Sequence, residues 1–132
     1  MRPVKNLFLV DDDEIYVFLT KRTIEETNLA DQVKIFRNGK EAIDFLEGAA
    51  DNIELLPEII FLDITMPILD GWGFIEEYIS LKPRLGKKIT LYIVSTSVSP
   101  ADIQRAKEIS VVSDFIIKPV TKEKFIDVIK KL

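Results

Sequence analysis

Short apolar segments alternate with longer segments of helical periodicity along the chain. Segments rich in β-branched and aromatic residues predict strands at about residues 5–10, 32–37, 58–63, 88–94 and 113–118. Most are apolar at nearly every position, which is typical of strands covered on both faces, whereas 32–37 alternates and is typical of an edge strand. Repeated strand and helix units predict an α/β fold with a parallel sheet.

Between these strands, apolar residues recur at helical spacing. We expect three stripes to face the core: Ile15, Phe18 and Leu19; Phe74, Ile75, Tyr78 and Ile79; and Phe125, Val128, Ile129 and Leu132. Asn38–Gly39 is a start signal for the second helix, and Ser99–Pro100 is one for the fourth, with proline at its first position. Pro83 and Gly86 break the chain before the fourth strand.

Composition limits the classes of protein that fit. At 132 residues, with 47% hydrophobic and 30% charged residues, we expect residues 1–132 to form a single domain without an output domain. The net charge of −4 and the pI near 4.9 disfavour nucleic-acid binding. No apolar segment has the length of a signal peptide or a membrane span, so we expect a cytoplasmic protein that does not contact the membrane.

Polar side chains follow the predicted strands at the points where the strands end. Asp11–Asp13 follow the first strand, Asp63 the third, Ser95 and Thr96 the fourth, and Lys118 the fifth. In an open α/β sheet, ligands bind outside the carboxyl ends of the strands. Two carboxylates about 4 Å apart repel by roughly 4 kcal/mol at an effective dielectric near 20, so such a cluster favours a divalent metal site. One carboxylate could then act as a nucleophile.

Histidine and cysteine are absent from the sequence, which excludes imidazole and thiolate chemistry on this chain. Nucleotide-binding motifs fit poorly, because a phosphate-binding first loop needs glycines and this one reads Asp-Asp-Asp-Glu from Asp11. The later run Gly71–Gly73 lacks a third glycine at the required spacing, and we interpret it as a turn and helix entry.

Four ordered motifs at these strand ends resemble the receiver domains of two-component response regulators, over essentially the whole chain. They are Leu9–Asp13, Phe61–Gly71, Tyr92–Thr96 and Phe115–Pro119. The resemblance implies a flavodoxin-like (βα)5 three-layer sandwich whose parallel five-stranded sheet has the order 2-1-3-4-5.

The resemblance also implies a phosphorylation site. Asp63 would be the phosphoacceptor, taking a phosphoryl group from a phosphohistidine on a histidine kinase or phosphotransfer protein. Mg²⁺ would be held by Asp11, Asp12, Asp63 and the backbone carbonyl of Thr65. Asp13 is as well explained by capping the following helix.

The remaining matched positions imply a switch. Lys118 would reach Asp63 or the phosphoryl oxygens, and the family's cis peptide before Pro119 would direct it inward. Ser95 would bind a phosphoryl oxygen, and Phe115 would turn inward in response. These changes would alter the face formed by the fourth helix, fifth strand and fifth helix, where a downstream protein would bind. A homodimer formed through the same face is also an open possibility.

Three departures from the family pattern affect the expected kinetics. Thr96 replaces a small residue and could narrow access to the phosphoryl group, while Phe115 lacks the hydroxyl of the tyrosine often found there. Thr65 and Ser97 offer no carboxylate or carboxamide to orient a water molecule, so we expect slow to moderate autodephosphorylation.

We therefore expect a signalling switch that is not a conventional enzyme, although it would catalyse its own phosphorylation and slow autodephosphorylation at Asp63. Two other classes stay open. One is an interaction module with this fold that never takes phosphate. The other is a small Mg²⁺-dependent phosphatase with Asp63 as nucleophile and Asp11 or Asp12 as acid/base, which the length of the chain and the Lys118–Pro119 context disfavour.

Overall fold

Each predicted strand is a strand in the computed structural model, which describes residues 2–96 and 99–132. The strands are β1 (Val4–Val10), β2 (Ala30–Phe36), β3 (Ile59–Leu62), β4 (Thr90–Ser95) and β5 (Val112–Ile117). The helices are α1 (Glu14–Glu25), α2 (Gly39–Gly48), α3 (Gly71–Leu81), α4 (Pro100–Lys107) and α5 (Lys122–Lys130), with short 3₁₀ turns at Ile53–Leu55 and Lys82–Arg84. Asn38 and Ser99 cap α2 and α4 as predicted.

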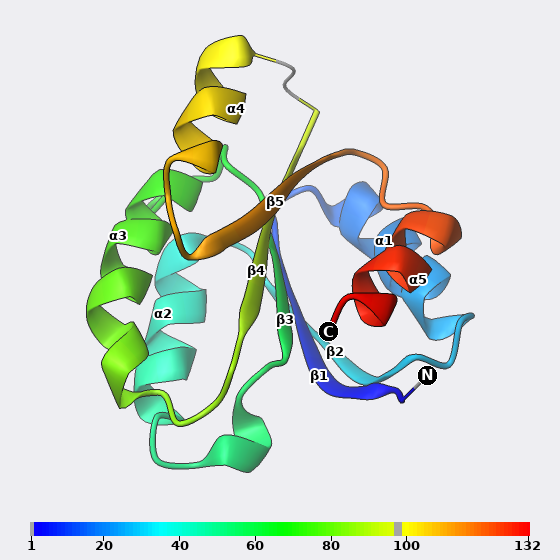
Figure 1. Ribbon diagram of the computed structural model, residues 1–132, viewed down its shortest axis with the longest axis horizontal. Helices are drawn as coiled ribbons and strands as arrows, with labels where there is room; N and C mark the ends of the chain where they lie inside the picture. Colours follow the sequence, from blue (N-terminus) through cyan, green and yellow to red (C-terminus); the bar gives the residue numbers. More distant parts are fainter. Residues whose placement is uncertain (1, 97–98) are drawn as a thin grey trace.

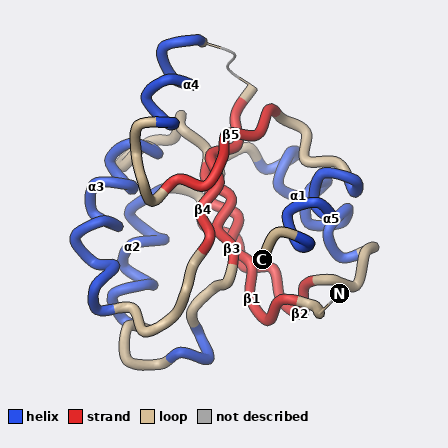
Figure 2. The backbone as a smooth tube through the Cα atoms, viewed as in Figure 1, coloured by secondary structure: helices blue, strands red, loops and turns tan. Residues whose placement is uncertain are grey.

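Within the described residues, the strands form one parallel sheet in the order β2-β1-β3-β4-β5. Figures 1 and 2 show α2 and α3 on one face of this sheet and α1 and α5 on the other. The flavodoxin-like three-layer fold expected from the resemblance is confirmed. The helices in the described part of the chain include none that is long and apolar enough to cross a bilayer.

Alternate residues of the central strands supply two separate cores. Phe8 and Val10 of β1 pack with α2 and α3, whereas Leu7 and Leu9 pack with α1 and α5. Because both faces of the sheet are covered, the strand needs apolar residues at every position, which explains its unbroken hydrophobic run. Val10 is paired with both Phe36 and Leu62, so the strands on either side of β1 end level with it.

The predicted core face of α1 is wrong. Ile15, Phe18 and Leu19 have exposed fractions of 75%, 65% and 54%. The residues that α1 buries are Val17, Thr20 and Ile24. Both sets have helical spacing, and the sheet selects the set that includes a threonine. The stripes predicted on α3 and α5 are buried apart from Ile79 and Leu132, which are 48% and 47% exposed.

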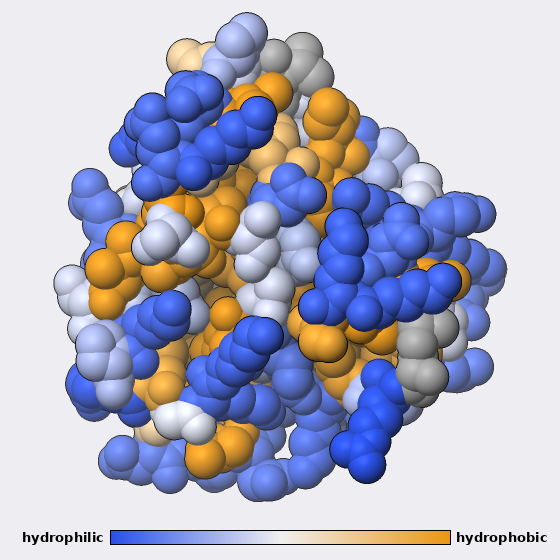
Figure 3. Space-filling view, in the orientation of Figure 1, coloured by the Kyte–Doolittle hydropathy of each residue, from blue (hydrophilic) through white to orange (hydrophobic). Residues whose placement is uncertain are grey.

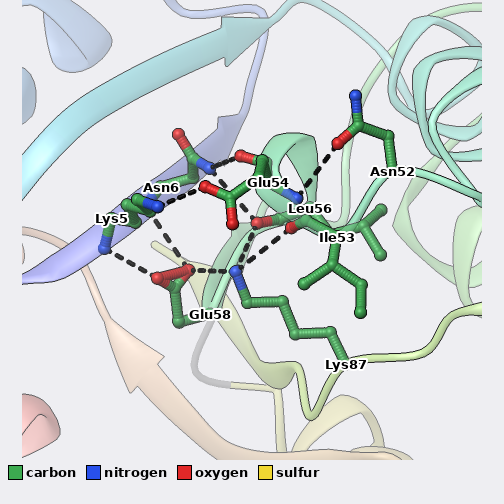
Figure 4. Close-up of polar contacts among 8 residues, drawn as sticks. All are labelled: Lys5, Asn6, Asn52, Ile53, Glu54, Leu56, Glu58 and Lys87. Atoms are coloured by element: carbon green, nitrogen blue, oxygen red, sulfur yellow. Dashed lines mark hydrogen bonds and ion pairs between the residues drawn. The ribbon is translucent and has the colours of Figure 1, made fainter.

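An ion-pair network joins the amino ends of β1 and β3 (Figure 4). Asp63 lies at the opposite, carboxyl end of these strands. The Lys87 ammonium lies 3.1 Å from a Glu58 carboxylate oxygen, and the Lys5 backbone N–H donates to Glu58 at 2.7 Å. The Lys5 ammonium pairs with Glu54, whose backbone carbonyl accepts from the Asn6 side chain at 2.8 Å. The network fixes the segment before β3 and contains none of the predicted site residues.

Candidate functional site at the carboxyl edge of the sheet

Three predicted metal ligands meet where β1 and β3 end. Asp11, Asp12 and Asp63 each offer a carboxylate oxygen, and these oxygens lie within 4.8 Å of one another. Asp11 and Asp63 are 4% and 8% exposed, whereas Asp12 is exposed. The backbone N–H of Asp63 donates to the Val10 carbonyl at 2.9 Å, so the ladder between β1 and β3 continues into the site.

The cluster is electrostatically unfavourable by itself. Burial raises the pKa of Asp63 to about 6, and the negative charge of Asp11 adds to this shift. Lys118 and a hydrogen bond from the Ile64 backbone oppose it. Three oxygen donors from carboxylates, two of them buried, have the chemistry that a hard divalent cation such as Mg²⁺ prefers. The residues present therefore fit such an ion.

Lys118 enters this cluster from the end of β5. Its ammonium lies 2.7 Å from Asp11 Oδ2 and 3.8 Å from Asp63 Oδ1, and its side chain is 10% exposed. The Lys118–Pro119 peptide bond is cis, as the resemblance implied. The sequence led us to expect Lys118 beside Asp63, and the structure adds that its closer partner is Asp11.

The end of β4 lies beside that of β5. The Ser95 backbone carbonyl accepts a hydrogen bond from the Lys118 N–H at 2.9 Å, and Ser95 is 4% exposed. Thr96, directly after it, is exposed. Phe115 is half-buried and packs against the core that α2 and α3 cover. The structure thus brings Ser95 to the edge where Lys118 lies, with Phe115 further back along β5.

Asp13 caps α1, which agrees with the capping interpretation. Its Oδ1 accepts from the Tyr16 backbone N–H at 3.0 Å, and its own N–H donates to Asp11 Oδ1 at 2.9 Å. Thr65 is exposed in the loop after β3, two residues beyond Asp63. Ser97 lies outside the described residues, so its predicted effect on dephosphorylation stays a prediction.

The loop between β3 and α3 closes tightly over the site backbone. A Cβ atom at Gly71 would lie 2.4 Å from the Asp63 carbonyl oxygen, so only glycine fits there. The Gly71 N–H donates to the Ile64 carbonyl at 2.8 Å, and Asp70 caps α3 through the Gly73 N–H. The interpretation of Gly71–Gly73 as a helix entry is confirmed, and the structure shows why the first glycine is needed.

Two features of α1 beside the site were missed in the sequence. The ring of Tyr16 lies against Lys118, with its centroid 4.1 Å from the ammonium nitrogen. The exposed residues Ile15, Phe18 and Leu19, here called the α1 apolar stripe, lie on the same helix. Phe18 lines a pocket of about 330 Å³ that Asp11 and Asp12 also line. The only signal for the stripe was its helical spacing, which equally fitted a core face.

Comparison with known proteins identifies the class to which this fold and site belong. The family model of the response regulator receiver domain matches residues 7–130, so the chain belongs to that family of phosphorylation-dependent signalling domains. A two-component response regulator from Cytophaga hutchinsonii, known from a crystal structure, has a TM-score of 0.90 at 27% identity. That match covers 98% of this chain and 97% of the other.

Curated relatives agree with this class. Probable methanogenesis regulatory protein FilR2 from Methanothrix harundinacea is 29% identical over 117 residues, covering 89% of this chain and 74% of the relative. Chemotaxis protein CheY from Thermotoga maritima is 27% identical over 128 residues, covering 97% of each. Several other relatives are much longer, and this chain spans only 11% to 30% of their length.

Proposed function

We propose that this receiver domain is a signalling switch whose Asp63 accepts a phosphoryl group from a phosphohistidine on a histidine kinase or phosphotransfer protein. The observation that carries this proposal is the meeting of Asp11, Asp12, Asp63 and Lys118 at one edge of the sheet. We propose that residues 1–132 act as a single receiver domain. We also propose that this domain works in the cytoplasm, where it would meet its phosphohistidine donor.

In the transfer step, a carboxylate oxygen of Asp63 attacks the phosphorus atom. A phosphorus–oxygen bond forms, the phosphorus–nitrogen bond to the donor imidazole breaks, and that nitrogen keeps the bonding pair and takes up a proton. Mg²⁺, held by Asp11, Asp12, Asp63 and the Thr65 carbonyl, would neutralise charge between the two anions. Lys118 is close enough to turn from Asp11 toward oxygens on Asp63 and supply a further positive charge.

Loss of the phosphoryl group is proposed to be slow to moderate. Thr65 is exposed two residues beyond Asp63 and carries only a hydroxyl, which is a weak group for activating water. The protein would thus promote its own phosphorylation and dephosphorylation without being a conventional enzyme. An aspartyl phosphate lifetime of only seconds would overturn this part of the proposal.

Output is proposed to occur on the face formed by α4, β5 and α5, through Ser95 and Phe115. Phe115, Ile103 and Ile117 line a pocket of about 320 Å³ there, and Figure 3 shows hydrophobic surface between α4 and β5. Within α4, burial is limited to Ala106, so this helix can shift at small cost in buried surface. We propose that a downstream protein covers this pocket.

The α1 apolar stripe supports a second contact, with the phosphodonor. An apolar patch that remains exposed and is bordered by polar residues is typical of an interaction surface. Phe18 joins the stripe to the acidic cluster through the pocket shared with Asp11 and Asp12. We propose that the phosphohistidine protein covers this stripe while its imidazole approaches Asp63.

The experiment that tests the function is intact mass after incubation with acetyl phosphate, with and without Mg²⁺. Wild type should gain one phosphoryl group only when Mg²⁺ is present, and Asp63→Asn should gain none. If wild type fails with acetyl phosphate and with a phosphohistidine donor, a phosphorylation-independent interaction module becomes the better description. Sedimentation of the phosphorylated protein would reveal whether a second copy, rather than a downstream protein, occupies the α4 face.

A further inference from the structure

We propose that Tyr16 is a positioning residue for Lys118: the face of its ring holds the ammonium group while that group exchanges Asp11 for phosphoryl oxygens on Asp63. This inference rests on the proposed function of Asp63. It assigns a role to a residue that neither the motifs nor the acidic cluster includes.

The contact is short and largely shielded from water. The Lys118 ammonium nitrogen lies 4.1 Å from the centroid of the Tyr16 ring, well inside the range of a cation–π contact. The Lys118 side chain is only 10% exposed, and the Tyr16 hydroxyl is buried without a hydrogen bond to the described residues. Burial raises the pKa of Tyr16 to about 12, and the negative charges of Asp11 and Asp63 add to this shift, so the phenol is neutral near pH 7.

The position of Lys118 between two carboxylates favours an additional contact with an aromatic ring. A shielded ammonium is costly unless charges or dipoles surround it. Its nearest charged group is Asp11 at 2.7 Å, while Asp63 is at 3.8 Å, so the ammonium must shift its contacts when phosphate forms on Asp63. A ring face attracts a cation without using a directed hydrogen bond. Tyr16 can therefore stabilise the ammonium in both arrangements.

The loop between β1 and α1 holds the ring and the competing carboxylate together. Asp13 Oδ1 accepts from the Tyr16 backbone N–H at 3.0 Å, which fixes Tyr16 in the first turn of α1. The Asp13 N–H donates to Asp11 Oδ1 at 2.9 Å, leaving Asp11 Oδ2 for Lys118. One capping residue thus sets the spacing between the two groups that hold Lys118.

The test compares Tyr16→Leu, which removes the ring, with Tyr16→Phe, which keeps it. We expect the rate of phosphorylation by acetyl phosphate to fall about threefold to tenfold in Tyr16→Leu and to recover in Tyr16→Phe. Tyr78→Leu is the matched control, because Tyr78 is a buried tyrosine in the core on the other face of the sheet. It should lose stability while its phosphorylation rate stays unchanged.

A spectroscopic measurement tests the contact without phosphorylation. The Lys118 ε-CH₂ signal, assigned by its loss in Lys118→Arg, should be shifted upfield by the aromatic ring in wild type and Tyr16→Phe. In Tyr16→Leu it should return to the range of ordinary lysines. A double variant supplies the last test, since Tyr16→Leu should slow phosphorylation no further once Lys118→Met has removed the ammonium.

The results separate the role of Tyr16 from the proposed function of Asp63. Unchanged phosphorylation in Tyr16→Leu, an ordinary Lys118 signal in wild type, or additive losses in the double variant would overturn the role of Tyr16 while leaving Asp63 as phosphoacceptor. If wild type itself takes no phosphoryl group from acetyl phosphate or from a phosphohistidine donor, the proposed function fails, and the role of Tyr16 fails with it.

Discussion

At the scale of single residues, Asp63 carries a stability cost that its proposed chemistry explains. Its pKa is raised from 3.8 to about 6, because the carboxylate is buried and faces Asp11. As pH rises from about 4 toward 6, the carboxyl group of Asp63 ionises in the unfolded chain before it ionises in the native protein. This stabilises the unfolded chain relative to the native state, so the free energy of unfolding falls. The loss is complete only above the raised pKa, and it amounts to roughly 2 to 3 kcal/mol at neutral pH.

We therefore predict that Asp63→Asn stabilises the metal-free protein at pH 7 by roughly 2 to 3 kcal/mol, since an amide has no charge to bury. The gain should disappear near pH 4, where the native carboxyl is protonated. Urea unfolding of both proteins between pH 4 and 8 in a chelator measures it. The exposed Asp51→Asn variant should show no such pH-dependent gain. A constant difference between Asp63→Asn and wild type at all pH values would contradict this account.

Ile68 is a second residue with a local cost in stability. It has a φ of 69° in the loop after Asp63, where a β-branched side chain is strained, and it is 82% exposed. We predict that Ile68→Asn stabilises the protein by roughly 0.5 to 1 kcal/mol, because asparagine tolerates this conformation and little burial is lost. Thermal unfolding measures the change. Ile53→Asn, at an exposed isoleucine without positive φ, should give no gain.

At the scale of elements, α1 shows where sequence reasoning reached its limit. Its existence and capping residue followed from local pattern, but its buried face did not, because two sets of residues share helical spacing. The choice depends on how the helix sits against the sheet, which no local pattern contains. Thr20 is buried and Phe18 is exposed, so hydrophobicity by itself favoured the wrong face.

This correction predicts a contrast in stability. Ile24→Ala should lower the free energy of unfolding by roughly 2 to 4 kcal/mol, because Ile24 is fully buried and its truncation leaves a cavity. Phe18→Ala should change it by less than about 0.5 kcal/mol, because Phe18 is 65% exposed. Urea denaturation checks both. A larger loss of stability for Phe18→Ala than for Ile24→Ala would mean that the face containing Phe18 packs against the core, as the sequence first predicted.

The same element supplies a prediction about the donor. If the phosphohistidine protein covers the α1 apolar stripe, Phe18→Glu should reduce phosphotransfer from that protein about tenfold or more relative to transfer from acetyl phosphate. The ratio of the two rates is the measurement, because it cancels any change in the reactivity of Asp63. Ile79→Glu, on an exposed position of α3, is the control and should leave the ratio unchanged. Equal ratios in wild type and Phe18→Glu would exclude the stripe as the donor contact.

At the scale of the whole molecule, the sequence was sufficient to place the site but not to resolve its contacts. Parallel strands end at one edge, so residues that follow β1, β3, β4 and β5 had to converge there. The pairing of Lys118 with Asp11 and the ring of Tyr16 depend on side-chain directions across three segments, which spacing along the chain does not encode. The meeting of these residues at one end of the sheet was therefore predictable, whereas the individual side-chain contacts among them were not.

The two ends of the sheet differ in what they contribute. The carboxyl end holds a carboxylate whose burial lowers stability, and the amino end holds the network of Figure 4. In that network, Lys87 and Glu58 are 17% and 23% exposed, and the Lys87 ammonium also donates to the Leu56 carbonyl at 3.0 Å. Removing Lys87 would leave a partly buried carboxylate and a carbonyl without this partner.

We predict that Lys87→Met lowers the free energy of unfolding by roughly 1 to 3 kcal/mol, because the groups left behind keep their desolvation cost. Phosphorylation of Asp63 by acetyl phosphate should be unchanged, since the network lies at the other edge of the sheet. Lys40→Met removes an exposed pair with Asp44 on α2 and should cost less than about 0.5 kcal/mol. Denaturation and phosphorylation measured on the same samples would separate the two ends. A slower phosphorylation in Lys87→Met would mean that strain at the amino ends of β1 and β3 reaches the site through these strands.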